Sequence, residues 1–300
     1  MAESIRTPRL LAFGEILWDV IGPREFIGGA PFNFAAHAVK CGLAADLYSR
    51  IGRDSRGDRA RAALASHRVG SDWLQLDSER PTGWVDVELE NGQPRYTIGP
   101  DAAWDRIAAP DNAAAASLRA AGFQALVCGT LAQRSVANRQ ALRALRPCLR
   151  DVPVFYDVNL RPPHTPLELV QETLPGVTWL KVNVDEAQNL AHALWKTTLS
   201  ERDFVSRVQR EYGVKLVIIT RGADGASVLT SDDVVEVRGI PTQLASAVGA
   251  GDAFAAAFLA ATLTGKSIAD ALERANRLGS WVASQPGAVP DYPADLLGPT

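Results

Sequence analysis

The sequence predicts an α/β protein with a doubly wound, mostly parallel central sheet, helices on both faces and a small β lid. Short β-branched runs alternate with helix-compatible segments over most of the 300 residues, two glycine-rich turns each lead into a helix, and one hairpin interrupts the order. Such alternation favours parallel pairing, because crossover helices cover both faces of the sheet. We expect a single domain over residues 1–300, with the lid drawn from about 15–27 and 82–100.

Composition narrows the class of protein. Hydrophobic residues make up 47% of the chain and charged residues 22%, as in globular proteins rather than disordered ones. The net charge is −3, from 34 acidic and 31 basic residues without a long run of either sign. Nucleic acid is therefore not an expected partner, because sequence-independent binding requires a concentrated basic surface.

Cysteines and apolar runs indicate the compartment. Cys41, Cys128 and Cys148 are odd in number and widely spaced, which is typical of free thiols in a reducing compartment. The apolar segment Leu10–Phe13 is too short for a signal-peptide core, and Ala253–Leu263 is too short to span a bilayer. We expect a cytoplasmic protein without a membrane partner.

The first part of the chain predicts a strand, a helix and a second strand. Leu10–Leu17 is an apolar run that we interpret as one buried strand, with Asp19 just past it. The glycines of Gly28–Gly29 and the proline that follows predict a helix start, with Asn33 in its first turn. Ala45–Ile51 is the second predicted strand.

An antiparallel hairpin follows and is the candidate lid. Trp84–Glu90 alternates apolar and acidic residues, Asn91–Gly92 supplies a tight turn, and Arg95–Ile98 resumes the strand. Because the rest of the chain alternates helix and strand, this hairpin is expected to stand off the main sheet.

From residue 111 onward the alternation is regular. The predicted helices are Asn112–Ala121, Val136–Arg146, Leu167–Leu174, Glu186–Leu194, Arg202–Tyr212 and Ile268–Ser284, and the predicted strands are Phe123–Cys128, Pro153–Tyr156, Val177–Val182 and Val214–Thr220. Polar clusters follow three of these strands, at Asp157–Pro162, Asn183–Glu186 and Thr220–Gly225. Each cluster alone is compatible with a capped turn, but the carboxyl ends of parallel strands share one edge, so together they predict a binding site.

A second glycine-rich turn precedes a helix rich in alanine. Gly249, Ala250 and Gly251 leave their amides uncovered, and Asp252 falls in the first helical turn. Such a helix start attracts phosphate or a developing oxyanion. The carboxylate is either an ordinary complement to the helix dipole or a base beside an anion site, and the residues alone leave both interpretations open.

These stretches resemble the two signatures of the ribokinase-like (PfkB) carbohydrate kinases. Gly-Ala-Gly-Asp with its helix is similar to the second signature, and Gly-Gly-Ala-Pro-Phe-Asn is similar to the first. Together with Gly-Glu-Ile-Leu-Trp-Asp they look like the fructokinase branch. The resemblance implies a ribokinase-like fold, with Asp252 as catalytic base and Gly249, Ala250 and Gly251 as the anion hole.

The resemblance also implies a sugar site. Asp19 and Asn33 would hydrogen-bond sugar hydroxyls, Gly28 and Gly29 would line the site, and Tyr96 would lie near the sugar. In this family the lid closes over the sugar and often forms a dimer contact, so a homodimer through the lid is an expected partner. His37, one turn beyond Asn33, is expected to be satisfied by the protein rather than to bind a ligand.

ATP and Mg2+ are the cofactors that the resemblance implies. Arg161 matches the arginine that lies on the phosphates, Asn183 and Glu186 match the pair that orders magnesium and its waters, Thr220, Gly222 and Gly225 match the loop that lines the nucleotide, and Asn276 matches a residue near the adenine.

One departure from the family pattern concerns a monovalent cation. The second signature usually begins Asp-Thr, where this chain has Ser246 and Ala247. In potassium-activated members that aspartate helps to bind the ion. Because a hard cation gains most from anionic or carbonyl oxygen, we expect this site to be weak or absent.

We therefore predict an ATP-dependent kinase that phosphorylates a primary hydroxyl of a monosaccharide, with fructose as the leading substrate. The alternatives are 2-keto-3-deoxygluconate, ribose or a nucleoside as substrate, or a catalytically weak sugar-binding regulatory module. A dinucleotide-binding oxidoreductase is disfavoured, because no Gly-x-Gly-x-x-Gly follows the first strand.

Overall fold

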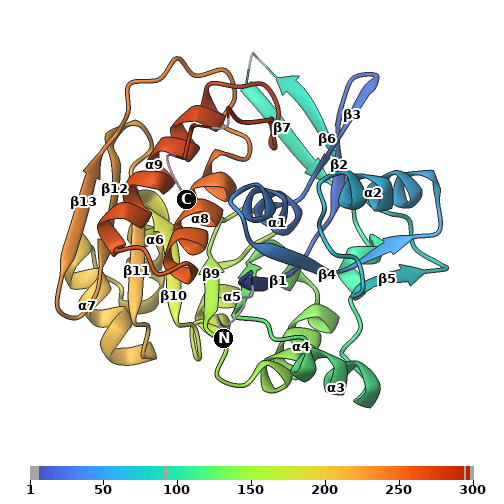
Figure 1. Ribbon diagram of the computed structural model, residues 1–300, viewed down its shortest axis with the longest axis horizontal. Coiled ribbons are helices and arrows are strands. Elements are labelled where there is room, and N and C mark those ends of the chain that lie inside the picture. The colour runs from blue at the N-terminus through green and yellow to red at the C-terminus, as the bar shows by residue number, and fades with distance from the viewer. Residues whose placement is uncertain (1–6, 91–92, 294, 298–300) are drawn as a thin grey trace, which may run out of the picture.

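The computed structural model describes residues 7–90, 93–293 and 295–297, and it confirms the expected α/β fold with a mostly parallel sheet. The central sheet has nine strands in the order β13-β12-β11-β10-β9-β8-β1-β4-β5 (Figure 1). Strand β12 pairs antiparallel with both of its neighbours, β11 and β13, and the other described pairs of this sheet are parallel. The strands are β1 (Arg9–Phe13), β4 (Ala44–Gly52), β5 (Leu74–Asp77), β8 (Ala125–Gly129), β9 (Val154–Asp157), β10 (Trp179–Asn183), β11 (Leu216–Thr220), β12 (Gly225–Leu229) and β13 (Val234–Arg238).

Both faces of this sheet are buried, because its strands point side chains alternately to two apolar cores. In β1, Leu10 and Ala12 belong to one core, and Leu11 and Phe13 belong to the other. The first core is covered by α1 (Ala30–Lys40), α2 (Ser55–Ser66), α8 (Ala250–Leu263) and α9 (Ile268–Ala283). The second is covered by α3 (Asn112–Ala120), α4 (Val136–Leu145), α5 (Leu167–Thr173), α6 (Val184–Trp195) and α7 (Glu201–Tyr212).

A second, four-stranded sheet stands beside α2 (Figure 1). It consists of β3 (Arg24–Gly28), β2 (Leu17–Ile21), β6 (Gly83–Glu90) and β7 (Gln93–Ile98), in that spatial order. The indole Nε1 of Trp18 donates to the carbonyl of Arg56 at 3.0 Å, which ties this sheet to α2. The segments expected to form the lid overlap these strands. The closure of the lid over a substrate stays a prediction.

The expected single strand Leu10–Leu17 is wrong. β1 ends at Phe13, the chain bends at Gly14 with φ of 143°, and β2 begins at Leu17 in the second sheet. A Cβ at Gly14 would lie 2.7 Å from Cγ of Pro31, so the bend lies against the start of α1. Asp19 consequently lies inside a strand of the small sheet rather than after a strand of the large one.

The order of the strands changes direction at β1. The chain proceeds from β1 to β4 and β5 on one side, and later from β8 to β13 on the other. The carboxyl ends of β1 and β8 therefore border the crevice where ligands bind in open α/β sheets. Within the described residues no helix is long and apolar enough to cross a membrane, and the three cysteines are free thiols.

Candidate active site

The start of α8 is an uncapped turn with its amides directed away from the helix body. Gly249 is the N-cap residue in the left-handed conformation, with φ of 80°, and no described side chain caps the turn. A Cβ at Gly249 would lie 2.2 Å from the carbonyl oxygen of Ala288, so both the backbone angle and the space require glycine. Ala250, Gly251 and Asp252 form the first turn. The amide of Ala250 donates to the carbonyl of Ala247 at 3.4 Å, which leaves the amides of Gly251 and Asp252 and the helix dipole to stabilise an anion.

Asp252 contacts Asn33, which lies 219 positions earlier in the sequence. The side-chain amide Nδ2 of Asn33 donates to Oδ2 of Asp252 at 2.9 Å, and both residues are buried. Burial first and the nearby Asp157 second raise the pKa of Asp252 to about 7, against smaller opposing effects of Asn33, Lys181 and Arg161. A carboxylate with this pKa is suited to take a proton near neutral pH.

A buried ion pair that sequence reasoning missed lies beside the turn. Nζ of Lys181 donates to Oδ1 and Oδ2 of Asp157 at 3.0 and 2.8 Å. A Cβ at Gly251 would lie 3.6 Å from that Nζ, so the ammonium group faces the first turn of α8. The available sign was one lysine within the otherwise apolar start of β10.

The predicted sugar-binding residues gather at the start of α1. Asp19 lies on β2 close to Gly28, where a Cβ would be 2.7 Å from Oδ2 of Asp19. Gly29 is the N-cap residue of α1, with φ of 106°. Burial raises the pKa of Asp19 to about 6, while Arg161 lowers it. Oδ1 of Asn33 is buried and has no hydrogen-bond partner among the described residues.

Glu15 is a second group that sequence reasoning missed. It is 3% exposed, its Oε2 has no partner among the described residues, and burial raises its pKa. The backbone amide of Ala30 and the charges of Arg161 and Arg134 act in the opposite direction, which places the carboxyl at the start of α1. An unpaired buried acceptor costs roughly 1–3 kcal/mol of stability. A ligand that donates hydrogen bonds to Oε2 of Glu15 and Oδ1 of Asn33 would remove this cost.

Asn183 and Glu186 form a reciprocal cap at the start of α6. Oδ1 of Asn183 accepts from the amide of Glu186 at 2.8 Å, and Oε2 of Glu186 accepts from the amide of Asn183 at 2.9 Å. Oε1 of Glu186 accepts from the amide of Leu160 at 2.8 Å. This cap therefore braces the loop that carries the exposed Arg161, whose Nη1 donates to the carbonyl of Leu160.

The predicted nucleotide residues lie farther along the same edge. Thr220 ends β11 in register with Asn183, and Gly222 follows it with φ of 56°. At Gly225 a Cβ would lie 2.1 Å from the carbonyl oxygen of Val237. The side chain of Asn276, on α9, donates to the carbonyl of Arg238 at the end of β13.

Three apolar side chains before the anion turn are exposed and were also missed from the sequence. Ile240, Leu244 and Val248 are 41%, 69% and 43% exposed. They follow β13 and precede Gly249 in the chain, and Ile240 is two positions after Arg238, whose carbonyl accepts from Asn276.

Two other predicted positions add little geometry. Tyr96 lies on β7 opposite Val87, and its side chain is outside the described part of the chain. Oγ of Ser246 accepts from the amide of Val248 at 3.2 Å, and the amide of Ser246 donates to the carbonyl of Ala283. The weak or absent cation site stays a prediction.

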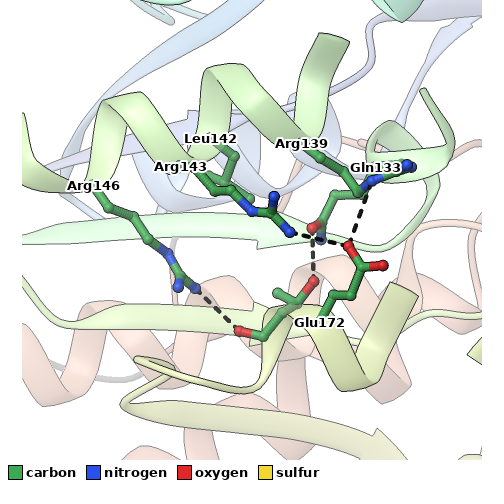
Figure 2. A pocket seen from close by; sticks show the side chains of 7 residues that line it. Gln133, Arg139, Leu142, Arg143, Arg146 and Glu172 are labelled. Carbon is green, nitrogen blue, oxygen red and sulfur yellow. Dashed lines mark hydrogen bonds and ion pairs between the residues drawn. The ribbon is translucent and has the colours of Figure 1, made fainter. Parts of the chain in front are cut away.

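A small cavity of about 20 Å³ lies between α4 and α5, and Gln133 of the loop after β8 lines it (Figure 2). The hydroxyl of Thr173 donates to Oε1 of Gln133 at 2.7 Å. Nε2 of Gln133 donates to the carbonyl of Gly129 at 2.8 Å. Arg134 next to it makes a two-point ion pair with Asp105. Gln133 and Arg134 therefore fix the position of this loop at the edge of the crevice.

Comparison with curated proteins gives relatives along most of the chain. A 5-dehydro-2-deoxygluconokinase from Halalkalibacterium halodurans is 27% identical over 274 residues, covering 87% of this chain and 80% of that protein. A fructokinase from Rhizobium leguminosarum bv. trifolii is 27% identical over 296 residues, covering 90% and 86%.

Solved structures share the fold. A fructokinase from Vibrio cholerae O395 with fructose, ADP and calcium bound has a TM-score of 0.80 at 23% identity, covering 94% of this chain and 95% of that one. A fructokinase from Xylella fastidiosa with bound ATP has a TM-score of 0.81 at 21% identity, covering 94% of each chain.

The family model for the pfkB family carbohydrate kinases matches residues 4–295. This match includes both sheets and every residue placed above in the crevice, and the chain belongs to the pfkB family of carbohydrate kinases.

Proposed function

We propose that this protein is an ATP-dependent kinase that transfers the γ-phosphate to a primary hydroxyl of a monosaccharide, with fructose as substrate. The observation that carries the proposal is the contact between Asn33 and Asp252, which joins the sugar-side helix α1 to the uncapped start of α8. A base with a pKa of about 7 beside bare amides suits phosphoryl transfer to an alcohol.

The proposed reaction assigns one task to each part of the site. Asp252 takes the proton of the sugar hydroxyl as its oxygen attacks the γ-phosphorus and the bond to the leaving ADP oxygen breaks. Asn33 orients the carboxylate through Oδ2. The amides of Gly251 and Asp252 and the guanidinium of Arg161 stabilise the charge on the transferred group.

Magnesium fits this site as an ion that keeps its waters. No group of three or more His, Cys, Asp and Glu among the described residues is arranged to hold a metal directly. Mg2+ typically uses one or two carboxylates and substrate phosphates. Glu186, whose oxygens each keep one lone pair beyond their amide bonds, and Asn183 would hold it, and the ion would neutralise phosphate charge.

Charge supports fructose over acidic sugars. Glu15, Asp19 and Asp252 surround the sugar position with acceptors. Arg134 is already paired with Asp105, and Arg161, which lowers the pKa of all three carboxyls, is assigned here to the transferred phosphoryl group. A neutral polyol supplies hydroxyl donors to these acceptors, whereas 2-keto-3-deoxygluconate or 5-dehydro-2-deoxygluconate adds a carboxylate that they repel. Ribose and nucleosides are neutral and remain the competing substrates.

Steady-state ATP consumption against fructose, ribose, adenosine and the two acidic sugars tests the proposal. We expect the highest kcat/KM with fructose, and we expect Asp252→Asn to bind fructose but to lose roughly 10²–10⁴ in turnover. Higher kcat/KM with another sugar would correct the substrate. Fructose binding in calorimetry without turnover by the unmodified protein would favour the regulatory module instead.

We further propose that the protein is cytoplasmic, where ATP is available as the phosphate donor. We also propose that it forms a homodimer through the small sheet. Ile21 and Phe26, on β2 and β3, are 42% and 43% exposed, and β3 is an edge strand of that sheet within the described part of the chain. Light scattering should give twice the chain mass, and Phe26→Glu should reduce it to the monomer. A monomeric unmodified protein would contradict this arrangement.

A further inference from the structure

The segment that follows α9, residues 286–292, is fastened to α1. Nε2 of His37 is hydrogen-bonded to the carbonyl oxygen of Ala288 at 2.9 Å, and Nδ1 of His37 is hydrogen-bonded to the hydroxyl of Tyr292. The two rings are stacked with centroids 5.8 Å apart, and Trp281 packs edge-on against Tyr292. At the rim of the same contact, Lys40 donates to Asp291 at 2.6 Å.

The direction of these hydrogen bonds follows from the chemistry of the groups. A carbonyl oxygen only accepts, so Nε2 of His37 carries the proton and donates to Ala288. His37 is 0% exposed, and its burial lowers its pKa to about 4, so the imidazole is neutral at physiological pH. Nδ1 is then an acceptor, and the hydroxyl of Tyr292 donates to it.

The same carbonyl of Ala288 lies against the anion turn. A Cβ at Gly249 would lie 2.2 Å from the oxygen of Ala288 and 2.7 Å from its Cα. Two backbones this close cannot shift independently, because packed atoms resist overlap. The position of residue 288 therefore limits where Gly249, and with it the first turn of α8, can lie.

We propose that the relay from Tyr292 through His37 to Ala288, here called the latch, positions the anion turn for phosphoryl transfer. His37 is then a positioning residue, acting through the Ala288 carbonyl without touching the substrate. The turn has no side-chain cap, and Ser246 and Ala247 before it carry no charge, so the latch supplies a fixed support from the other side. This inference rests on the proposed kinase function.

Matched substitutions at His37 test the latch. His37→Leu removes the donor to Ala288, and we expect kcat to fall roughly tenfold to 100-fold with the KM for sugar nearly unchanged, because misplacement of the amides affects the transition state. His37→Gln keeps an amide donor near the position of Nε2, and we expect it to restore most of kcat. Lys40→Met removes the bonds to Pro290 and Asp291 and the cation over the Tyr292 ring but keeps both hydrogen bonds of His37, and it should behave like the unmodified protein.

Three kinetic results would overturn the latch. They are an unchanged kcat in His37→Leu, a kcat in His37→Gln as low as in His37→Leu, and an equal loss in Lys40→Met. The last result would mean that any loosening of the segment suffices and that the relay has no particular part.

Hydrogen exchange separates the latch from the kinase proposal. The amides of residues 247–253 should exchange faster in His37→Leu than in the unmodified protein, with His37→Gln in between. This measurement does not depend on turnover. If the unmodified protein phosphorylates no sugar, the proposed function fails, while faster exchange in His37→Leu still supports the latch and equal exchange overturns it.

Tyr292→Phe decides the matter if His37→Leu does not fold. It removes only the hydroxyl and keeps the stacked ring. We expect a folded protein with faster exchange over residues 247–253 and a modest loss of kcat. Exchange and kcat equal to those of the unmodified protein would overturn the relay.

Discussion

Lys181 is a buried cation that acts on the pKa of the proposed base. Its ammonium group lowers the pKa of Asp252, whereas Asp157 raises it. In Lys181→Met the charge of Asp157 is left unpaired, so the pKa of Asp252 should rise above about 7 and the acid limb of kcat/KM should move to higher pH. The free energy of unfolding should fall by roughly 3–5 kcal/mol, because a buried charge loses its partner.

The double variant Lys181→Met with Asp157→Asn is the control for this prediction. It removes both charges, and the acid limb should return toward its original position. A pH–rate profile of Lys181→Met that superimposes on that of the unmodified protein would show that the pair has no electrostatic effect on Asp252.

At the scale of single residues, sequence motifs predicted the side chains that lie at the starts of helices. The Gly-Ala-Gly-Asp turn and the asparagine after Gly-Gly-Ala-Pro could be placed at helix starts from the sequence, and the structure brings Asn33 and Asp252 into contact. The surroundings of Glu15 and Lys181 could not be predicted, because a lone charged residue in an apolar run does not indicate which partner the fold brings to it.

Among the elements, the turn before α8 allows a test with matched glycines. Gly249 and Gly265 both have φ of 80°, but only Gly249 has backbone within reach of a Cβ, and Gly251 has neither constraint. Gly265→Ala should lose roughly 1–2 kcal/mol of unfolding free energy, from the left-handed angle alone. Gly249→Ala should lose more and should also lose turnover, and Gly251→Ala should be close to neutral in stability.

Chemical denaturation and steady-state kinetics of the three variants measure these effects. Equal losses in Gly249→Ala and Gly265→Ala would mean that the approach of Ala288 to the turn costs nothing. In that case the support of the turn by residue 288 would have to be abandoned.

The cation prediction also belongs to this turn. Neither Ser246 nor Ala247 supplies an anionic oxygen, so turnover in sodium-free buffer should change by less than about twofold when potassium is added, because weak binding shifts no equilibrium. Coupled-assay rates with potassium or a tetraalkylammonium salt provide the comparison. Strong stimulation by potassium alone would contradict the prediction.

Regular elements were predictable to within a few residues at most of their ends, since hydrophobic period and caps act locally. The exceptions depended on distant contacts. The break at Gly14 is set by the approach of Pro31, and β12 and β13 extend the sheet after its parallel part without the helix between strands that made the other strands recognisable.

For the molecule as a whole, burial of Asp252 lowers the free energy of unfolding by an amount that depends on pH. The pKa of Asp252 is about 7 in the fold against an ordinary value of 3.8, so between these values the folded protein holds a proton that the unfolded chain releases. Stability therefore falls as the pH rises through this window. Asp252→Asn removes the effect, and its stability gain should grow by roughly 1–3 kcal/mol from about pH 5 to about pH 8.

Urea denaturation of the two proteins at both pH values measures this gain. A stability difference that is the same at both values would place the pKa of Asp252 near that of an exposed carboxyl. The base would then be ionised throughout, and the acid limb of the rate profile would need another source.

The packing of residue 288 against Gly249 has a consequence for synthesis. The turn that would stabilise the transferred phosphoryl group comes earlier in the chain than the segment that supports it. A nascent chain still held in the ribosome at that point has both sheets' strands but an unsupported turn, so we expect catalytic competence to arise only after residue 292 has emerged.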